Sequence, residues 1–341
     1  MHKPRSSTGS PLSIGEVARR AGVSIATVSR IVNGVTNKAS PDTIARVRAV
    51  IAQLGYRPTG AGQALRKGRS RLVAVLAANI ANPAMTAIAA SIETALRDVG
   101  LAMVLCDTHE RPELQDEYLL EMRAQAVRAT ILLGAVPSDA LAEAMAADAT
   151  ILFVNRRCPI GRSAPFVGID NVAAGATVAN AIHNTRPRGR LALIHGPLNS
   201  SATVDRIAGF KREAEQRGRR LAASDIVTAP GLDHLDIGYT AMAALLAQRD
   251  EPAAVFCSSD LIAFGAHRRL RESRRLAPQG PALIGFDDNP LNDWIAPWLS
   301  SVRVPYREFG PAIVKTLERL WRGETGDTPL LPFEFVDRGL R

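Results

Sequence analysis

The chain has few of the residues that build metal centres or disulfide frameworks. Its 341 residues include three cysteines, Cys106, Cys158 and Cys257, with no CxxC pair. An odd number of widely spaced cysteines argues against a disulfide framework or a zinc site and indicates buried or incidental thiols. The six histidines show no ligand spacing. We therefore predict no metal and no cofactor.

Long hydrophobic runs and known catalytic motifs are also absent. No stretch of eighteen or more uncharged apolar residues occurs, and the N-terminus, MHKPRSSTGS, lacks the apolar core of a signal peptide. The chain contains no GxSxG, P-loop, HExxH or paired-carboxylate signature. We therefore expect a cytoplasmic protein that is neither membrane-bound nor an enzyme.

Residues 13–33, SIGEVARRAGVSIATVSRIVN, contain two short amphipathic segments. In the first, apolar residues recur at i, i+3, i+4 and i+7, which is one face of a helix. Gly22 permits a sharp turn, and Ser24 is suited to cap a second helix whose Val28 and Ile31 point inward. This pattern is typical of a helix-turn-helix, although an ordinary three-helix bundle would share it. The outer face of the second helix carries Ile25, Ala26, Thr27, Ser29, Arg30 and Asn33.

A third helix is expected after Ser40. The distribution of charge along the chain favours a DNA-binding helix-turn-helix over an ordinary three-helix bundle. Residues 1–70 contain twelve Lys or Arg against two acidic residues, a net charge of +10. The whole chain has 42 Lys or Arg and 33 Asp or Glu, so residues 71–341 keep 30 against 31, a net charge of −1. Such a concentration of positive charge in one small helical segment indicates contact with phosphates, weakened steeply by salt.

From residue 72 onwards, short apolar runs alternate with helical segments. Alternation of strand and helix predicts parallel sheets covered by helices on both faces. About nine strands are many for one sheet, and a break at residues 156–161 divides them, so we expect two similar α/β lobes with a cleft between them. The predicted strands are Leu72–Ala77, Leu101–Cys106, Ala129–Leu133, Thr150–Val154, Phe166–Ile169, Leu191–Ile194, Asp225–Val227, Ala253–Cys257 and Ala282–Gly285.

These patterns predict three parts along the chain. A ligand is expected in the last of them, beyond the carboxyl ends of the strands, as is usual in parallel α/β folds. The parts are a helix-turn-helix domain at 1–58, a hinge helix or linker at 59–70 and a core at 71–341, with an N-lobe of about 71–160 plus 292–320 and a C-lobe of about 161–291 plus 321–341.

Seven segments, in order, carry a resemblance to a known family. They are AGVSIATVSRIVNG at 21–34, SPDTIARVRAVIAQLGYRP at 40–58, ALRKGRS at 64–70, DRIAGF at 205–210, SSDLIAFGA at 258–266, IGFDD at 284–288 and LSSVRVP at 299–305. Through them the chain resembles, over nearly its whole length, the lactose-repressor and galactose-repressor family of bacterial transcription regulators. The resemblance implies a periplasmic-binding-protein-like core that binds a small effector, often a sugar or nucleobase. It also implies a homodimer on a pseudo-palindromic double-stranded operator, and the sequence leaves a tetramer open.

The resemblance also assigns roles to the DNA-binding residues. Ile25, Ala26 and Arg30 would read bases in the major groove, where Arg30 is suited to a bidentate contact with guanine. Leu65 of the hinge helix would be an apolar wedge that enters the minor groove and kinks the operator. Phosphate contacts, which fix the register without specifying sequence, would come from Ser24, Thr27, Ser29 and Asn33.

In the core, the same resemblance places an effector site on six residues. A site that combines Arg, Asp and Asn suits hydroxyl or carboxylate groups. Asp260 is equally well explained as a helix N-cap. Arg206 has the alternative role of a satisfied interdomain ion pair, although a position in the cleft favours ligand contact. Family members often carry an aromatic pair after Asn-Pro, but Ala84 and Met85 stand there, so Trp294 or Phe153 would have to supply the stacking ring. The six residues are Asn155, Arg206, Ser259, Asp260, Asp287 and Trp294.

Together, these observations predict a nucleoid-associated, sequence-specific transcription regulator, a repressor controlled by a sugar, sugar acid or related metabolite. An effector that releases DNA and one that promotes binding are both compatible with the sequence. Two alternatives remain, a solute-binding receptor and an enzyme with a DNA-binding appendage. A solute-binding receptor would need an export signal and would not need the basic module. An enzyme would need a catalytic signature.

Overall fold

In a computed structural model, the chain forms two units, Met1–Ser70 and Arg71–Arg341. The structure describes residues 13–32, 34–56, 70–147, 150–276, 280–324 and 330–340. Among these residues, no helix is both long and apolar enough to cross a membrane.

The first unit contains the expected three helices, α1 (Ile14–Ala21), α2 (Ile25–Val32) and α3 (Pro41–Leu54). Gly22 ends α1 in the left-handed region, with φ of 65°, and so makes the sharp turn. The Ser24 hydroxyl accepts a hydrogen bond from the Thr27 amide at 3.2 Å, which caps α2. The helices enclose a small core of Val17, Ala18, Ala21, Val28, Ile31 and Val47.

The first sheet of the core has the strand order β2-β1-β3-β4-β5, and all its strands are parallel. Its strands are β1 (Leu72–Ala77), β2 (Ala102–Asp107), β3 (Ala129–Leu133), β4 (Ile151–Val154) and β5 (Phe166–Val167). Helices α5 (Pro83–Asp98) and α13 (Tyr306–Trp321) cover one face, while α6 (Pro112–Ala124) and α7 (Asp139–Ala146) cover the other. Burial on both faces explains why the central strands are apolar throughout rather than alternating.

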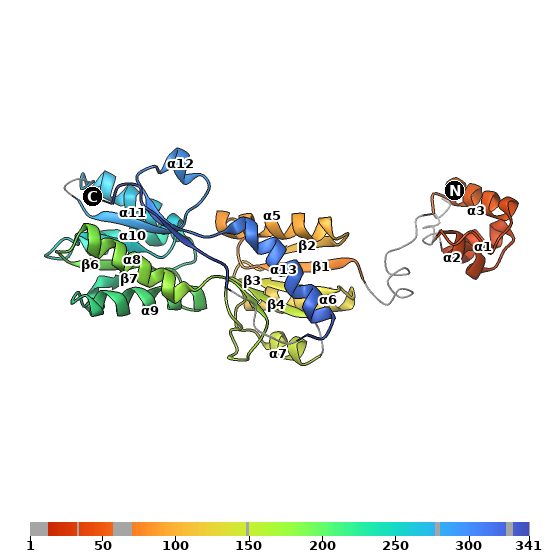
Figure 1. The fold of residues 1–341 in the computed structure, drawn as a ribbon, viewed down its shortest axis with the longest axis horizontal. Helices are drawn as coiled ribbons and strands as arrows, with labels where there is room; N and C mark the ends of the chain where they lie inside the picture. The colour runs from red at the N-terminus through yellow and green to blue at the C-terminus, as the bar shows by residue number, and fades with distance from the viewer. Residues whose placement is uncertain are drawn as a thin grey trace, which may run out of the picture. The chain divides into compact units, whose positions relative to one another are not determined.

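The second sheet has the order β11-β10-β9-β8-β6-β7, in which only β11 is antiparallel to its neighbour among the described strands. Helices α8 (Asn171–Thr185) and α9 (Ser201–Gln216) cover one face, and α10 (His234–Leu246) and α11 (Asp260–Glu272) cover the other. A 3-10 turn, η1 (Ala223–Asp225), lies between α9 and β7. A short helix, α12 (Asn292–Ile295), lies between β9 and β10 and is labelled in Figure 1. The strands are β6 (Leu191–Ile194), β7 (Ile226–Val227), β8 (Ala254–Cys257), β9 (Ala282–Asp287), β10 (Ser300–Arg303) and β11 (Glu334–Val336).

All nine predicted strands are present with ends within two residues, but β10 and β11 were missed. Strand β10 was missed because it begins with two polar residues, Ser300 and Ser301, although both are buried. Strand β11 was missed because it is a half-exposed edge strand of three residues. These strands also move the lobe boundaries. Because β5 pairs with β4, and β10 with β9, residues 166–167 belong to the N-lobe and 300–303 to the C-lobe, contrary to the predicted divisions at 160 and 292.

Glycines let two helix pairs of the C-lobe approach each other closely. A Cβ on Gly175 of α8 would lie 2.2 Å from the Arg206 carbonyl oxygen, and one on Gly209 of α9 would lie 1.9 Å from the Val172 carbonyl oxygen. The α10–α11 pair shows the same arrangement at Gly238 and Gly265. The position of Arg206 thus depends directly on the α8–α9 crossing.

Candidate functional site

The exposed face of α2 is the first candidate site. Ile25, Ala26 and Arg30 are exposed, and Ile25 keeps 49% of its surface accessible although it is a large apolar residue. Val28 and Ile31, on the opposite face, are buried. The three predicted base-reading residues therefore share one accessible face. Asn33 and Leu65 lie outside the described residues.

Small polar side chains border this face. Ser24 is exposed, Thr27 and Ser29 are half-buried, and the Ser24 and Thr27 hydroxyls lie 3.0 Å apart. Part of the positive charge of the unit is already matched, because Arg19 and Arg20 both bind the Glu16 carboxylate. Their hydrogen bonds lower the pKa of Glu16 to about 2. Arg30 is the basic side chain of α2, and it is exposed.

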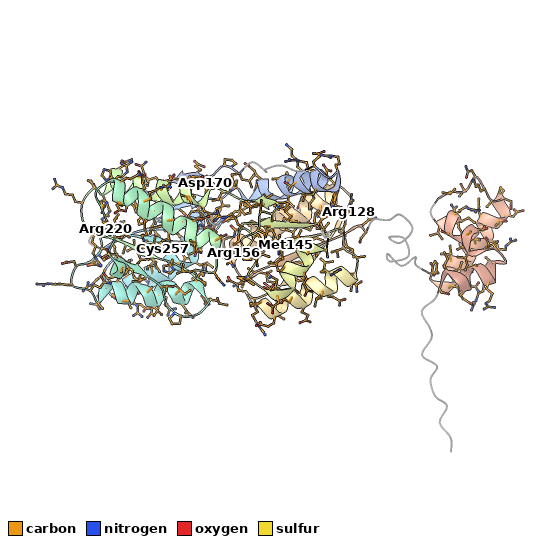
Figure 2. All side chains as sticks on the ribbon, turned by 90° about the horizontal axis from the view of Figure 1, so that it is seen from below. Arg128, Met145, Arg156, Asp170, Arg220 and Cys257 are labelled. Carbon is orange, nitrogen blue, oxygen red and sulfur yellow. The ribbon has the colours of Figure 1, made fainter. Side chains whose placement is uncertain are left out.

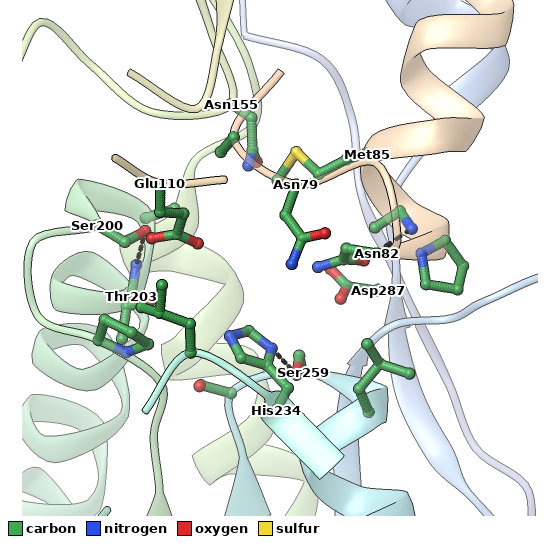
Figure 3. Close-up of a pocket in the computed structure, with 18 of the residues that line it drawn as sticks. Asn79, Asn82, Met85, Glu110, Asn155, Ser200, Thr203, His234, Ser259 and Asp287 are labelled. Carbon is green, nitrogen blue, oxygen red and sulfur yellow. Dashed lines mark hydrogen bonds between the residues drawn. The ribbon is translucent and has the colours of Figure 1, made fainter. Parts of the chain in front are cut away.

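The second candidate site is a cleft of about 450 Å³ in the core. Its walls come from both lobes, at the carboxyl ends of β1, β2 and β4 on one side and of β6, β8 and β9 on the other. Figure 3 shows the side chains of Glu110, Asn155, His234 and Asp287 around the same space. The cleft lies where ligands of parallel α/β folds bind.

Four of the six predicted effector residues line this cleft, namely Asn155, Arg206, Ser259 and Asp287. The other two do not. Asp260 is buried beside it, where its carboxylate accepts hydrogen bonds from the Ser301 hydroxyl, the Asn289 amide and the Asn292 side chain. Ser259, not Asp260, is the N-cap of α11. Trp294 stands on α12 with 83% of its surface exposed.

The expected stacking ring is not supplied by Trp294 or by Phe153. Phe153 belongs to β4, and its side chain is fully buried on the face of the first sheet that α6 and α7 cover. Among the described residues that line the cleft, the aromatic rings are those of Tyr306, His109 and His234. The Tyr306 hydroxyl donates to the Asp287 carbonyl oxygen at 2.8 Å. The cleft therefore offers more polar groups than ring faces.

Arg206 is a buried cation that lines the cleft. Its Nε donates to Asn171 Oδ1 at 2.9 Å, and its Nη1 donates to the Ser258 carbonyl oxygen at 2.7 Å. The guanidinium lies 3.5 Å from the centre of the Phe286 ring and 3.8 Å from an Asp287 oxygen. Burial lowers its pKa, and the charge of Asp287 opposes that shift. The side chain is thus held in one orientation before any ligand arrives.

Asp287 is the buried acid opposite Arg206. Burial raises its pKa to about 7, the charge of Arg206 opposes this shift, and the charge of the nearby Asp260 adds to it. Its backbone lies at φ of 113°, and Asn155 lies at 66°, both in the left-handed region. Strained backbone of this kind persists at sites where a side chain must point in a particular direction.

Because the carboxyl of Asp287 titrates near neutrality, the stability of the core is expected to depend on pH. Between about pH 4, the ordinary value of an aspartate, and pH 7, the folded state holds a proton that the unfolded state has lost. Raising the pH through this window therefore weakens the folded state, by at most about 1.4 kcal/mol per pH unit. Urea unfolding at several pH values should show the stability advantage of wild type over Asp287→Asn shrinking from pH 4 to 7. An advantage independent of pH would contradict this assignment.

A second ion pair, Glu110 with Arg156, was not predicted. Arg156 Nη2 lies 3.0 Å from Glu110 Oε1, and both side chains are almost fully buried, at 8% and 7% exposure. Figure 2 shows Arg156 at the junction between the lobes. Both residues follow strands of the first sheet, so the rule that strand ends build the site could have pointed to them.

Three further contacts lie in the cleft or join the two lobes. His234 Nδ1 lies 2.9 Å from the Ser259 hydroxyl, and burial lowers the pKa of this histidine. Arg157, which follows β4 in the N-lobe, binds the Asp205 carboxylate of α9 at 2.6 Å. The Arg157 amide also donates to the Ser201 hydroxyl at 2.9 Å. These two contacts of Arg157 join the lobes.

Across the described ranges, no group of three or more His, Cys, Asp or Glu could hold a metal ion.

Comparison with known proteins gives two family matches. Residues 13–59 match the family described as bacterial regulatory proteins, lacI family, and residues 73–293 match the periplasmic binding protein domain. The chain is 31% identical over 327 residues to the HTH-type transcriptional regulator CelR of Thermobifida fusca, covering 93% of this chain and 94% of the relative. It is 29% identical over 331 residues to the regulator DegA of Bacillus subtilis, covering 95% and 96%.

Two solved structures share the whole fold. The lac repressor dimer bound to operator and the anti-inducer ONPF has a TM-score of 0.80 at 25% identity, covering 96% of this chain and 98% of the other. The complex of the transcriptional regulator CelR with cellobiose has a TM-score of 0.71 at 27% identity, with the same coverages. Both alignments therefore extend over nearly the whole chain.

Proposed function

This chain belongs to the LacI family of bacterial regulatory proteins, and we propose that it is an operator-binding repressor whose α2 reads DNA and whose interlobe cleft binds a small, hydroxyl-rich effector. The observation that carries the proposal is the cleft, because the side chains of Arg206 and Asp287 both line it and form an ion pair of low solvent exposure. The exposed face of α2 supplies the second half of the argument.

On DNA, the proposal gives base contacts to Ile25, Ala26 and Arg30. Ser24, Thr27 and Ser29 would contact phosphates, and Asn33 and Leu65 keep the roles proposed for them from the sequence. The lac repressor binds its operator as a dimer. We propose the same arrangement here, because a module as small as α1–α3 reads too few base pairs alone for specific binding.

In the cleft, the polar groups favour a ligand with several hydroxyls. Carboxylate, amide and hydroxyl side chains accept and donate hydrogen bonds to such a molecule, and CelR holds cellobiose in a related structure. Since residues of both lobes line the cleft, a bound ligand would favour one relative orientation of the lobes. A change in that orientation is the proposed link to operator affinity, with either sign.

The proposal assigns the cleft a role in binding and not in catalysis. The relatives matched over nearly the full chain are transcriptional regulators. A purified core that consumes a bound sugar would favour the alternative of an enzyme with a DNA-binding appendage.

The experiment has two arms. Selection of DNA from a random library, followed by anisotropy titration, should yield a palindromic site that is bound far more tightly than random DNA. A thermal-shift screen of sugars, sugar acids and nucleobases should then find a compound that stabilises the core and changes operator affinity. Absence of sequence preference at moderate salt would contradict the DNA-binding half, and absence of any stabilising sugar would contradict the effector half.

Replacing Arg30 by alanine is expected to weaken binding to the selected site by about 1–3 kcal/mol and to relax preference at one base position, because a bidentate contact with guanine would be lost. Binding to random DNA should change much less. The matched control is Arg48→Ala, which removes one exposed charge from α3 and should weaken specific and random binding equally. Equal losses on both DNAs for Arg30→Ala would reassign Arg30 to a phosphate.

A further inference from the structure

Both arginines that line the cleft lie beside a carboxylate, and a further acid of the lining, Asp233, accepts hydrogen bonds from backbone amides at the start of α10. Arg206 lies beside Asp287, and Arg156 lies beside Glu110. A buried arginine without a partner would be a strong site for a carboxylate or phosphate group of a ligand. Here each arginine already has its own carboxylate, so the cleft offers no unmatched positive charge from these two residues.

Glu110 matches Arg156 closely. Its two oxygens accept hydrogen bonds from Arg156 Nη2 at 3.0 Å and from Nη1 at 3.3 Å, which is a fork-to-fork pairing. The Gly134 carbonyl oxygen lies 3.4 Å from the same Nη1. The pair is almost fully buried but lines the cleft, so a ligand in the cleft would sense the sum of its charges.

The backbone is strained to place this carboxylate. His109 and Glu110 are consecutive non-glycine residues in the left-handed region, with φ of 50° and 56°. Hydrogen bonds hold the turn, from the Glu110 amide to the Ala78 carbonyl oxygen at 2.8 Å and from the His109 amide to Asp107 Oδ1 at 2.9 Å. Such a conformation is costly and indicates that the direction of the side chain matters.

We propose that Glu110 determines the charge of the effector: by neutralising Arg156, it makes the cleft select uncharged polyhydroxy compounds and reject sugar acids and sugar phosphates. The inference rests on the proposed effector function of the cleft. The side chains left to contact such a ligand include the neutral amides of Asn79, Asn82 and Asn155 (Figure 3). A ligand carboxylate would instead meet Glu110 and Asp287 with no free arginine.

The test uses the full-length protein and matched ligand pairs. Neutral sugars are screened by thermal shift, and each sugar that binds is compared by calorimetry with its uronic or aldonic acid at pH 8. Wild type should bind the neutral member at least about tenfold more tightly than the acid. Glu110→Gln keeps the size of the side chain but leaves Arg156 unmatched, and it should shift the ratio of the two affinities at least about tenfold towards the acid.

Two further variants make the result decisive. Glu110→Gln combined with Arg156→Gln restores neutrality and should restore preference for the neutral sugar. Glu113→Gln, which removes a charge from an exposed carboxylate at the start of α6, should leave the ratio unchanged. A wild type that binds neutral sugars while Glu110→Gln keeps the same ratio contradicts this inference alone. A wild type that prefers the acid also contradicts it, and one that binds neither member of any pair contradicts the proposed function as well.

Discussion

Replacing Arg206 by methionine is expected to abolish the response to the effector while operator binding persists. Arg206 lines the cleft, and its guanidinium is fixed by Asn171 and the Ser258 carbonyl oxygen. Methionine has a similar length but donates no hydrogen bond. Effector affinity should fall about 100-fold or more, since hydrogen bonds from a charged group and the orientation of Asp287 are lost together.

The same change should also destabilise the core. Removing one partner of a buried ion pair leaves an uncompensated charge and costs about 3–5 kcal/mol. Here the loss should be largest at high pH, because the pKa of Asp287 is already raised and its carboxyl takes up a proton as the pH falls. Adding Asp287→Asn to Arg206→Met removes the unmatched acid and should recover most of the stability, but not the effector response.

Calorimetry with the effector and urea unfolding of the core separate these two effects. The control is Arg212→Met, the same substitution six residues further along α9 at an exposed position, and it should change neither quantity. Undiminished effector affinity in Arg206→Met would show that Arg206 serves only as an ion pair in the core. That alternative was left open by the sequence, and the experiment decides it.

The sequence predicted those parts of the molecule that depend on local patterns. The helix-turn-helix follows from helical spacing, a left-handed glycine and a serine cap, and all three are visible within residues 13–33. Asn155 and Asp287 were assigned to the effector site through the family resemblance, and both line the cleft. The rule that ligands of parallel sheets bind beyond the strand ends predicted where that cleft lies.

Features that depend on distant contacts were missed or misplaced. Asp260 stands next to a cleft residue in sequence, but three partners from residues 289–301 draw its carboxylate into the protein. Trp294 was considered as the stacking ring because Ala84 and Met85 stand where family members often carry an aromatic pair, yet α12 presents it to solvent. The Glu110–Arg156 pair joins residues 46 positions apart through a turn of unusual backbone geometry. Neither spacing nor composition reports such a contact.

The close packing at the helix glycines also depends on distant contacts and could not be predicted from the sequence. Within a helical pattern, a glycine indicates only a residue of low helix propensity. Gly175→Ala is expected to destabilise the core by about 3 kcal/mol, against a gain of about 1 kcal/mol in an open helix. The added Cβ would lie 2.2 Å from the Arg206 carbonyl oxygen, which is backbone and cannot rotate away. Helix α9 must then move, and Arg206 with it, so effector affinity should also fall, by about tenfold or more.

A comparison of double variants tests whether the crossing itself is the cause. Once Gly175→Ala has pushed α8 and α9 apart, a Cβ on Gly209 would clash less with the Val172 carbonyl oxygen. Adding Gly209→Ala should then lower the free energy of unfolding, measured in urea, much less than Gly209→Ala does alone. Gly265→Ala acts at the α10–α11 crossing, on the other face of the sheet, and its cost should add to that of Gly175→Ala within about 0.5 kcal/mol. Simple additivity in both pairs, or a Gly175→Ala protein as stable as wild type, would mean that the helices tolerate the methyl group without separating. Arg206 would then owe its position to its own hydrogen bonds and not to the glycines beneath it.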